Sequence, residues 1–364
     1  MEPNRHAPHD LIARYSYQPD DMLEGMITVH EPTGQSTIRR DSSSSSLGQL
    51  DKLPVELLQV LLGLLDLRSI SRLSRVSLRG HAIVRSFPTY RDLLKYASHT
   101  MAALGWTGSI RYHSATTLHR ELSSQSCVSC GYFGAFLFLP TCERCCYECL
   151  SRNHSLWVVP PALAKKCFDL NDCQIKDIPI IRSVPGVYKI GFHREMTRTR
   201  RLNLVSVKSA KALGIKVHGS TANMPDWSSL CRPWASSTKN LKENNYLRWL
   251  QDAPMQPLDG DPVMLPAQPH TPNDNYCGMA STPFPSILDG QLESGLWCRG
   301  CEWACEELLY ADEQEIEVAL GYSVPPDCEP ESILLGLKHR ARSKMEFARH
   351  VQNCYGVKKL AAGA

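Results

Sequence analysis

The chain has 364 residues and a mass of 40.8 kDa, which at about 150 residues per domain predicts two domains with connecting segments. Hydrophobic residues make up 43% and charged residues 21%, a composition that excludes wholesale disorder and a fibrous class. The net charge of only +3 excludes a polycation that coats nucleic acid. No apolar run approaches the roughly 18 residues that span a bilayer, and the N-terminus lacks a signal-peptide layout. We therefore expect a soluble protein of the cytoplasm, the nucleus or both, with no membrane partner.

Composition divides the chain into segments of an α+β, multi-domain protein. Residues 1–47 lack periodicity and contain a serine run, and residues 219–290 contain ten prolines, so both are expected to be disordered. A short helix is expected near LKENNYLRWL inside that proline-rich insert. The remaining segments are a helical module (48–94), connecting helices (95–122), a cysteine-rich region with a basic strand segment (123–218), and a C-terminal Cys/His block (291–360).

The helical module begins at LPVELLQVLLGLLDLRSISRLSRVS. Pro54 suits the first position of a helix, and Glu56 suits its first turn, where the helix dipole favours a carboxylate. The leucines that follow cover more than one helical face, and Asp66 can cap a second helix. Two interpretations stay open: a small bundle with every leucine internal, or a surface reserved for a partner.

This string, followed by IVRSFPTYRDLL, resembles an F-box, the module that docks on the Skp adaptor of cullin-RING ubiquitin ligases. The resemblance covers about residues 48–94. After Val76 the segment SLRGHAIV offers Leu78 and His81 where many F-boxes carry an aromatic residue, a departure that affects the third helix more than the docking helices. The resemblance implies that the Skp adaptor contacts Leu53, Pro54, Leu57, Leu58, Leu61, Leu65, Ile70, Leu73 and Val76.

Six of the 15 cysteines fall within CVSCGYFGAFLFLPTCERCCYECL. In a reducing compartment such cysteines favour metal ligation over disulfides. Cys127 and Cys130 form one Cys-x-x-Cys pair, and the second pair is either Cys142 with Cys145 or Cys146 with Cys149. We favour Cys146 and Cys149, because the residues between them could open a short helix. Four thiolates leave no open coordination position, so this predicts a structural zinc site without catalysis. The stretch also resembles one that follows the F-box in fungal F-box proteins.

A second closed site is predicted near the C-terminus. Cys298 and Cys301 form another Cys-x-x-Cys pair, and His350 and Cys354 are four residues apart, a spacing that places both on one helical face. Together they predict a Cys3His zinc site, and Cys305 is an alternative ligand. The protein would thus hold two structural zinc ions. The remaining cysteines are expected not to be ligands: Cys167, Cys173, Cys231, Cys277 and Cys328.

Positive charge is concentrated between residues 165 and 217, where twelve Lys or Arg accompany four Asp or Glu. Arg194, Arg198, Arg200 and Arg201 lie between two strand-like runs, 178–192 and 202–217. A solvated loop is one interpretation, and a surface that binds an anionic partner is another, because guanidinium groups suit carboxylate or phosphate. We do not expect nucleic acid, because no recognition helix flanks a zinc site and no aromatic residues alternate with the arginines.

The sequence contains no G-x-S-x-G, Walker-type loop or H-E-x-x-H, so we expect no enzyme. The leading hypothesis is an F-box adaptor of a cullin-RING (SCF-type) E3 ubiquitin ligase. Its helical module would bind the Skp adaptor, and its zinc-braced remainder would present a client protein for ubiquitination. The alternative is a zinc-dependent nucleic-acid-binding regulator, motivated by the arginine cluster and the two zinc-like sites.

Overall fold

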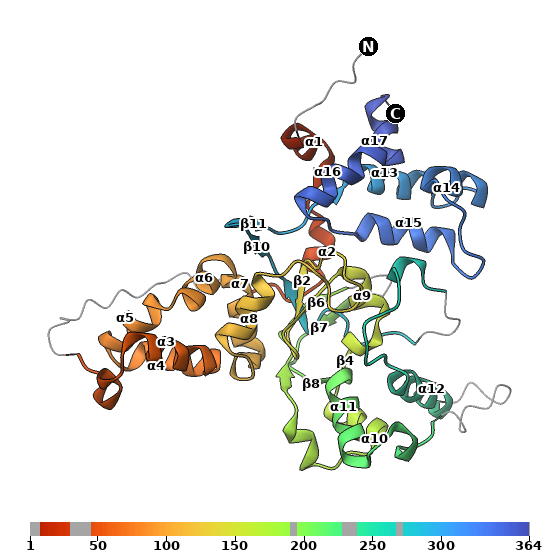
Figure 1. Ribbon diagram of the computed structural model, residues 1–364. Coiled ribbons are helices and arrows are strands. Elements are labelled where there is room, and N and C mark those ends of the chain that lie inside the picture. Colours follow the sequence, from red (N-terminus) through yellow and green to blue (C-terminus); the bar gives the residue numbers. More distant parts are fainter. Residues whose placement is uncertain (1–7, 30–44, 190–194, 228–238, 267–271, 364) are drawn as a thin grey trace.

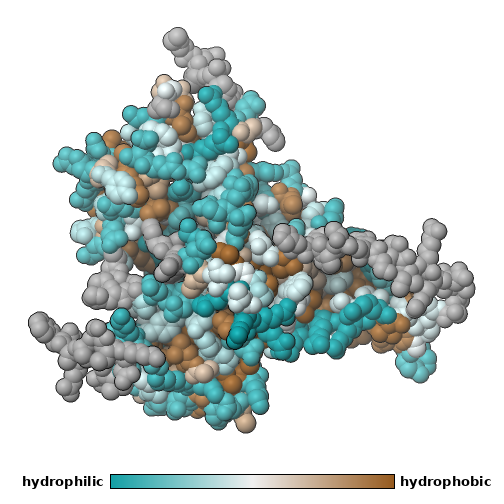
Figure 2. Space-filling model, turned by 180° about the vertical axis from the view of Figure 1, so that it is seen from behind, coloured by the Kyte–Doolittle hydropathy of each residue, from teal (hydrophilic) through white to brown (hydrophobic). Residues whose placement is uncertain are grey.

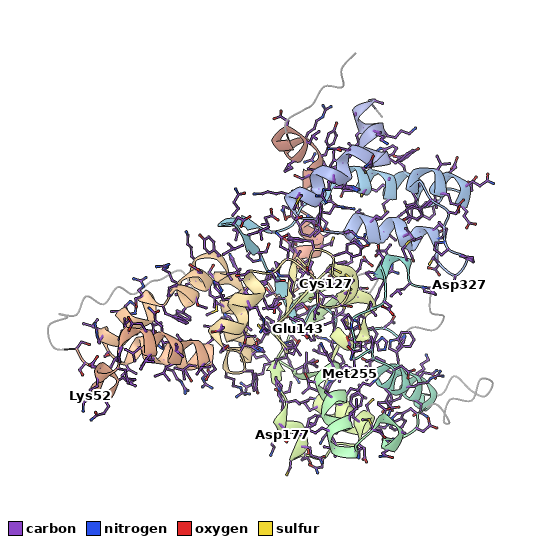
Figure 3. The ribbon with its side chains drawn as sticks, viewed as in Figure 1. Lys52, Cys127, Glu143, Asp177, Met255 and Asp327 are labelled. Carbon is purple, nitrogen blue, oxygen red and sulfur yellow. The ribbon has the colours of Figure 1, made fainter. Side chains whose placement is uncertain are left out.

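The computed structural model describes residues 8–29, 45–189, 195–227, 239–266 and 272–363. The protein is α+β, with many helices and five small sheets among these residues. An arm of helices extends from a central region that contains the sheet of β2, and helical lobes lie on two sides of that centre (Figure 1). Cys127 lies near the centre, where the arm and the lobes meet (Figure 3).

The arm contains the helical module and the connecting helices. Asp66 caps the second helix of the module as predicted, because its Oδ1 accepts a hydrogen bond from Ser69 N at 2.9 Å. Pro54 directly precedes the first helix instead of occupying its first position. The helices of the arm are α3 (Val55–Leu64), α4 (Leu67–Val76), α5 (Leu78–Ser86), α6 (Pro88–Tyr96), α7 (Ser98–Thr107) and α8 (Ala115–Leu122).

The central sheet joins segments that are far apart in the sequence. Strand β2 (Phe136–Phe138) lies between β3 (Glu143–Cys145) and β9 (Ser281–Pro283), and both pairings are antiparallel. Leu137 faces Arg144 on one side and Thr282 on the other. A short helix, α9 (Tyr147–Arg152), follows β3 directly. The sheet therefore depends on a strand from the segment that was expected to be a disordered insert.

A second sheet and three helices form the lower lobe of Figure 1. The strand order is β4 (Val158–Val159), β8 (Asn203–Ser206) and β5 (Ile180–Arg182). Strands β6 (Gly186–Tyr188) and β7 (Met196–Arg198) pair separately. The helices are α10 (Pro161–Phe168), α11 (Val207–His218) and α12 (Lys239–Gln251).

The strand-like prediction for residues 202–217 is wrong beyond Ser206. The Ser206 side chain accepts a hydrogen bond from Ser209 N at 3.3 Å and so caps helix α11. Ala210, Leu213 and Gly214 then lie on the buried face of this helix. Their spacing of three and four residues fits a helical period better than a strand.

The upper lobe combines the two ends of the chain. Its helices are α13 (Arg299–Leu308), α14 (Glu313–Leu320), α15 (Pro330–His339), α16 (Lys344–Asn353) and α17 (Tyr355–Ala361), joined by α1 (Pro8–Tyr15). Strand β1 (Ser16–Tyr17) pairs antiparallel with β12 (Trp297–Cys298). Helix α2 (Asp20–Glu24) and the hairpin of β10 (Ser286–Leu288) and β11 (Gln291–Glu293) lie between this lobe and the arm (Figure 1).

The expected disorder of the leader is therefore wrong for residues 8–29. Tyr15 is buried with Phe347 and Val351, and Leu11 and Ile12 pack against the same cluster. Met22, Met26 and Ile27 are buried in the main core. This burial depends on residues about 300 positions away, which a local reading of the sequence does not reveal. Residues 30–44 lie outside the described part of the chain.

The expected disorder of the proline-rich insert is wrong over most of its length. The helix expected near LKENNYLRWL is present as α12, and its Leu247 and Leu250 are fully buried against α10 and α11. Strands β9 and β10 also come from this segment. The prolines of this segment do not prevent a packed structure. Residues 228–238 and 267–271 lie outside the described ranges.

A buried arginine connects the arm to the central sheet. Arg144 donates hydrogen bonds to Glu121 O at 2.9 Å, to Phe284 O at 3.0 Å and to Pro285 O at 2.6 Å. Its side chain is fully buried, and this burial lowers the pKa of the guanidinium to about 10. The one side chain thus satisfies backbone carbonyls of helix α8 and of the turn after β9.

We predict that Arg144→Met destabilises the protein by about 3–5 kcal/mol, because several buried carbonyls lose their donor together. Urea unfolding followed by circular dichroism measures this change. Arg120→Met is the matched control, since Arg120 is an exposed arginine on helix α8, the helix that Arg144 contacts. The cost of this variant should stay below about 0.5 kcal/mol. Equal costs for the two variants would contradict the structural role of Arg144.

A buried carboxyl makes the stability depend on pH. Burial raises the pKa of Asp274 to about 7, and Asp274 Oδ1 accepts a hydrogen bond from Tyr276 N at 2.8 Å. Between pH ~4 and pH ~7 the folded state therefore holds a proton that the unfolded state has lost. The free energy of unfolding must fall as pH rises through this window.

We predict that Asp274→Asn makes the protein more stable than the wild type at pH 8, by roughly 1–4 kcal/mol. The amide keeps an acceptor for Tyr276 N and does not titrate. The difference between variant and wild type should shrink as pH is lowered toward pH ~4. Urea unfolding of both proteins at pH 5 and pH 8 measures it, and a difference that does not change with pH would disprove the assignment.

Candidate metal centres and the exposed ridge of α3

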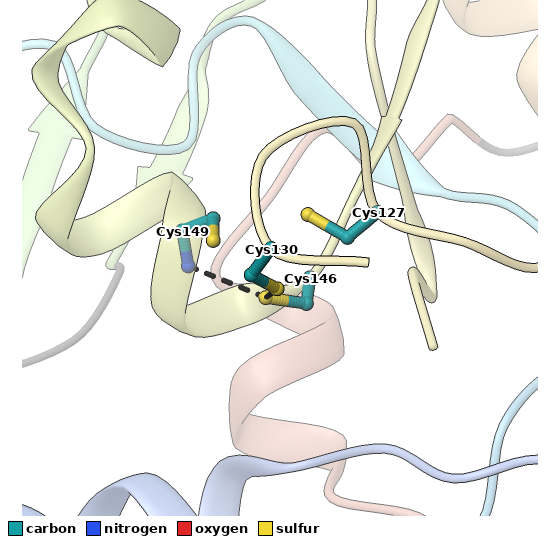
Figure 4. A group of neighbouring side chains, drawn as sticks. All are labelled: Cys127, Cys130, Cys146 and Cys149. Atoms are coloured by element: carbon teal, nitrogen blue, oxygen red, sulfur yellow. Dashed lines mark hydrogen bonds between the residues drawn. The ribbon is translucent and has the colours of Figure 1, made fainter. Parts of the chain in front are cut away.

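Four cysteines converge at the centre of the molecule. The sulfur atoms of Cys127, Cys130, Cys146 and Cys149 all lie within 4.8 Å of one another (Figure 4). The Sγ atoms of Cys130 and Cys146 are 3.6 Å apart. A tetrahedral zinc ion with Zn–S bonds of ~2.3 Å places its sulfurs ~3.8 Å apart. The cluster therefore has the ligand number and the spacing of a structural tetrathiolate site.

Local backbone structure holds both pairs of sulfurs in place. Gly131 has φ +77°, and its N–H donates to Cys127 O at 3.0 Å, which closes the first Cys-x-x-Cys turn. Cys146 is the N-terminal cap of α9, and its Sγ accepts a hydrogen bond from Cys149 N at 3.4 Å. The short helix expected from the second pair is thus present, and its first turn presents two sulfurs to the same point.

Contacts among the four sulfurs shift the pKa values of three of the thiols. Hydrogen bonds from the thiols of Cys130, Cys146 and Cys149 hold the pKa of Cys127 far below its usual range. The same contacts with Cys127 raise the pKa values of Cys146 and Cys149. A second thiolate would be repelled by the first at this distance. Only a bound cation would allow all four sulfurs to be thiolates, which is what zinc ligation requires.

The alternative second pair lies outside this group. Cys145 is part of β3, and its Sγ donates to Phe136 O at 3.7 Å inside the central sheet. Cys142 is buried in the turn before β3, with φ +54°. Burial raises the pKa of both thiols, which favours the uncharged form. The structure thus brings together the pair favoured from the sequence, Cys146 and Cys149.

The predicted second site is also assembled. The ligand atoms of Cys298, Cys301, His350 and Cys354 lie within 4.8 Å of one another. His350 Nε2 is 3.2 Å from Cys301 Sγ, and the Sγ atoms of Cys298 and Cys354 are 3.9 Å apart. Burial lowers the pKa of His350 and so favours the neutral imidazole that binds metals. The cluster suits a Cys3His zinc site in the upper lobe.

Two glycines allow the helices of this site to approach. Gly356 lies two residues after Cys354. A Cβ atom added at Gly356 would lie 1.9 Å from Gly300 O. Gly300 lies between Cys298 and Cys301, and a Cβ added there would lie 2.4 Å from Val357 N. Helices α13 and α17 therefore meet backbone to backbone beside the ligands, and no larger residue fits at either position.

The other cysteines in the described residues belong to neither group. Cys305, the alternative ligand, is buried in a separate cluster with Ile316 and Leu334. Cys231 lies outside the described residues. Cys167 and Cys277 are buried, Cys328 is half-buried and Cys173 is exposed.

Polar contacts beside the two centres were missed from the sequence. Glu148, between two ligands of the first centre, pairs with His339 Nδ1 at 2.9 Å and with Arg152 Nε at 2.8 Å. Burial opposes the charge on Glu148, but these two contacts outweigh it, so its pKa is lowered. Three residues after His339, Arg342 Nη2 lies 3.8 Å from the sulfur of Cys301. Isolated polar residues of this kind follow no motif that would have identified them.

Helix α3 exposes a ridge of large apolar side chains. Leu57 is 52% exposed, Leu61 is 42% exposed and Leu64 is 76% exposed. The arm carries brown, hydrophobic surface in Figure 2. Contiguous exposed apolar surface of this kind marks interaction sites. We call this surface the α3 ridge and define it by Val55, Leu57, Val60, Leu61, Leu64 and Leu65, which are all exposed.

The expected adaptor-binding residues divide between the ridge and the interior. Leu58 is buried and Ile70 is fully buried, so neither side chain is open to a partner in this structure, and their predicted contact with the Skp adaptor stays a prediction. Leu58 lies on the buried face of α3 and Ile70 on the buried face of α4, and both belong to the main core. Leu53 and Leu73 are half-buried, and Pro54 and Val76 are exposed.

Two of the described arginines of the basic cluster contact other parts of the chain. Arg198 donates to Asn275 O at 3.0 Å, and the guanidinium of Arg201 lies 5.5 Å from the ring centroid of Trp106. Arg200 is exposed, and Arg194 lies outside the described residues. Arg198 and Arg201 thus make contacts within the chain, although the side chain of Arg201 is exposed like that of Arg200.

Comparison with protein-family models, with curated proteins and with solved structures found no match for this chain. Within the described ranges, no helix has the length and apolar character to cross a membrane. What the molecule does must therefore be inferred from the two centres and the ridge.

We predict that Cys146→Ser reduces bound zinc from two ions per chain to one, because serine is a poor zinc ligand. Cys145→Ser should keep both ions, which makes it the matched control one residue away. Zinc content is measured by inductively coupled plasma mass spectrometry on purified protein. Loss of an ion from Cys145→Ser with retention in Cys146→Ser would reverse the ligand assignment.

Proposed function

We propose that this protein is an F-box adaptor of an SCF-type E3 ubiquitin ligase. The α3 ridge binds the Skp adaptor, and the zinc-braced remainder presents a client protein. The observation that carries the proposal is the exposure of Leu57 and Leu61 on a helix that already has a packed interior face. The resemblance of residues 48–94 to an F-box supplies the identity of the partner.

The division of α3 into two faces favours docking over self-burial. Leu58 and Leu62 are buried at 6% and 2% exposure, and they hold α3 against the arm. The ridge leucines are not needed for that packing, yet they keep much of their surface in water at a cost in free energy. A partner that covers the ridge would remove this cost, and Leu57 and Leu61, each about half-exposed, would each add roughly 1 kcal/mol to binding.

The two metal centres would supply rigidity and no chemistry. Each cluster offers four protein ligands, so a zinc ion bound there has no open position for water or substrate. Zinc in such sites contributes on the order of 10–16 kcal/mol to folding. Presentation of a client requires a body that holds its shape relative to the arm, and the clusters meet that need.

We predict that the double variant Leu57→Asp, Leu61→Asp loses binding to the Skp adaptor by more than ~100-fold, since roughly 2 kcal/mol of apolar contact is lost and two carboxylates would be buried without a partner. Copurification and calorimetric titration with the purified Skp adaptor measure it. Zinc content and the helical signal should match the wild type, because both side chains lie outside the core.

Val318→Asp is the control, because Val318 is 73% exposed on α14, far from the ridge. It should bind the Skp adaptor as the wild type does. Normal binding by the double ridge variant would refute the proposal, and so would an absence of binding by the wild type.

A further inference from the structure

A cavity of about 580 Å³ lies where the arm joins the body. Its walls come from the chain after α2, from the end of α6 with the start of α7, and from the segments of β9 and β11. These elements meet between the arm and the upper lobe in Figure 1. The volume falls within the range of roughly 300–1,000 Å³ that is typical of small-molecule sites.

The lining is mainly apolar and carries no formal charge. The apolar side chains of the lining include Leu23, Ile27, Phe284, Pro285 and Leu292. The sixteen lining residues, all within the described ranges, include no Asp, Glu, Lys or Arg. A charged ligand would lose its hydration here without gaining a counter-charge, so the cavity selects against ions.

A few polar groups are held at fixed positions around this apolar surface. Thr100 Oγ1 donates to Pro283 O at 3.2 Å, and Thr282 Oγ1 donates to Ile27 O at 3.0 Å. The Gln18 amide donates to Gly295 O at 3.2 Å. Small numbers of positioned polar groups in an apolar cavity orient a ligand. Both hydroxyl oxygens keep lone pairs that can accept a further hydrogen bond.

We propose that this cavity binds an uncharged, mainly apolar small molecule. Its ligand would touch the arm through His99 and Thr100 and the body through Ile27, Phe284 and Leu292. Binding would therefore favour one orientation of the arm relative to the body. The inference does not depend on the Skp adaptor, because the α3 ridge does not line the cavity.

The test uses Nile red, a neutral apolar dye, with full-length zinc-loaded protein. Wild type should bind one dye per chain in a saturable titration of fluorescence, and saturating dye should raise the Tm. Leu292→Glu places a carboxylate in the wall and should weaken binding at least tenfold. Leu288→Glu is the matched control: Leu288 is 42% exposed and Leu292 is 44% exposed on the same hairpin, and Leu288 does not line the cavity.

Two further variants keep the result unambiguous. The ridge variant Leu57→Asp, Leu61→Asp should bind the dye as the wild type does, and loss of binding there would place the dye on α3 and overturn the inference. If Leu292→Glu fails to fold, Thr28→Lys replaces it as the test, because Thr28 is an exposed residue that also lines the cavity. Unchanged dye affinity in a folded variant of either kind, or no saturable binding by the wild type, also overturns it.

Discussion

Four-ligand clusters are the constraint on which the rest of this structure depends. The strands are only two to four residues long, and the lobes have separate small cores. The first cluster fixes the turn before β2 and the start of α9, and the second fixes the start of α13 against α16 and α17. A metal site can contribute about as much free energy as the whole net stability of a domain, so the two sites can add to the main core what the small clusters of the lobes lack.

The sequence was most informative where a local rule decides the structure. Asp66 caps α4 and Cys146 caps α9, because capping depends only on the next few residues. The ligands of both clusters were found from their spacing in the same way. The alternative pair, Cys142 and Cys145, has the same spacing. It is excluded only by its place in the fold, because Cys145 belongs to β3 and Cys142 to the turn before it.

The sequence was least informative where burial depends on a distant partner. Leu11 and Tyr15 form part of a hydrophobic cluster with Phe347, and Leu247 packs against α10. Short apolar stretches among prolines and serines resemble disorder until their partners are known. The α3 leucines show a related limit: Leu57 and Leu58 are neighbours of the same type, yet one is exposed and the other is buried. Periodicity could not decide which face remains open to a partner.

The contacts of Glu148, His339 and Arg342 have a consequence for the loss of a metal ion. Glu148 lies between the ligands Cys146 and Cys149, and Arg342 reaches Cys301 in the other cluster. Displacement of α9 after loss of one ion would shift His339, and with it the strand-like segment that orients Arg342. Loss of a metal ion from one centre would then disturb the other, so the central region and the upper lobe would lose their structure together.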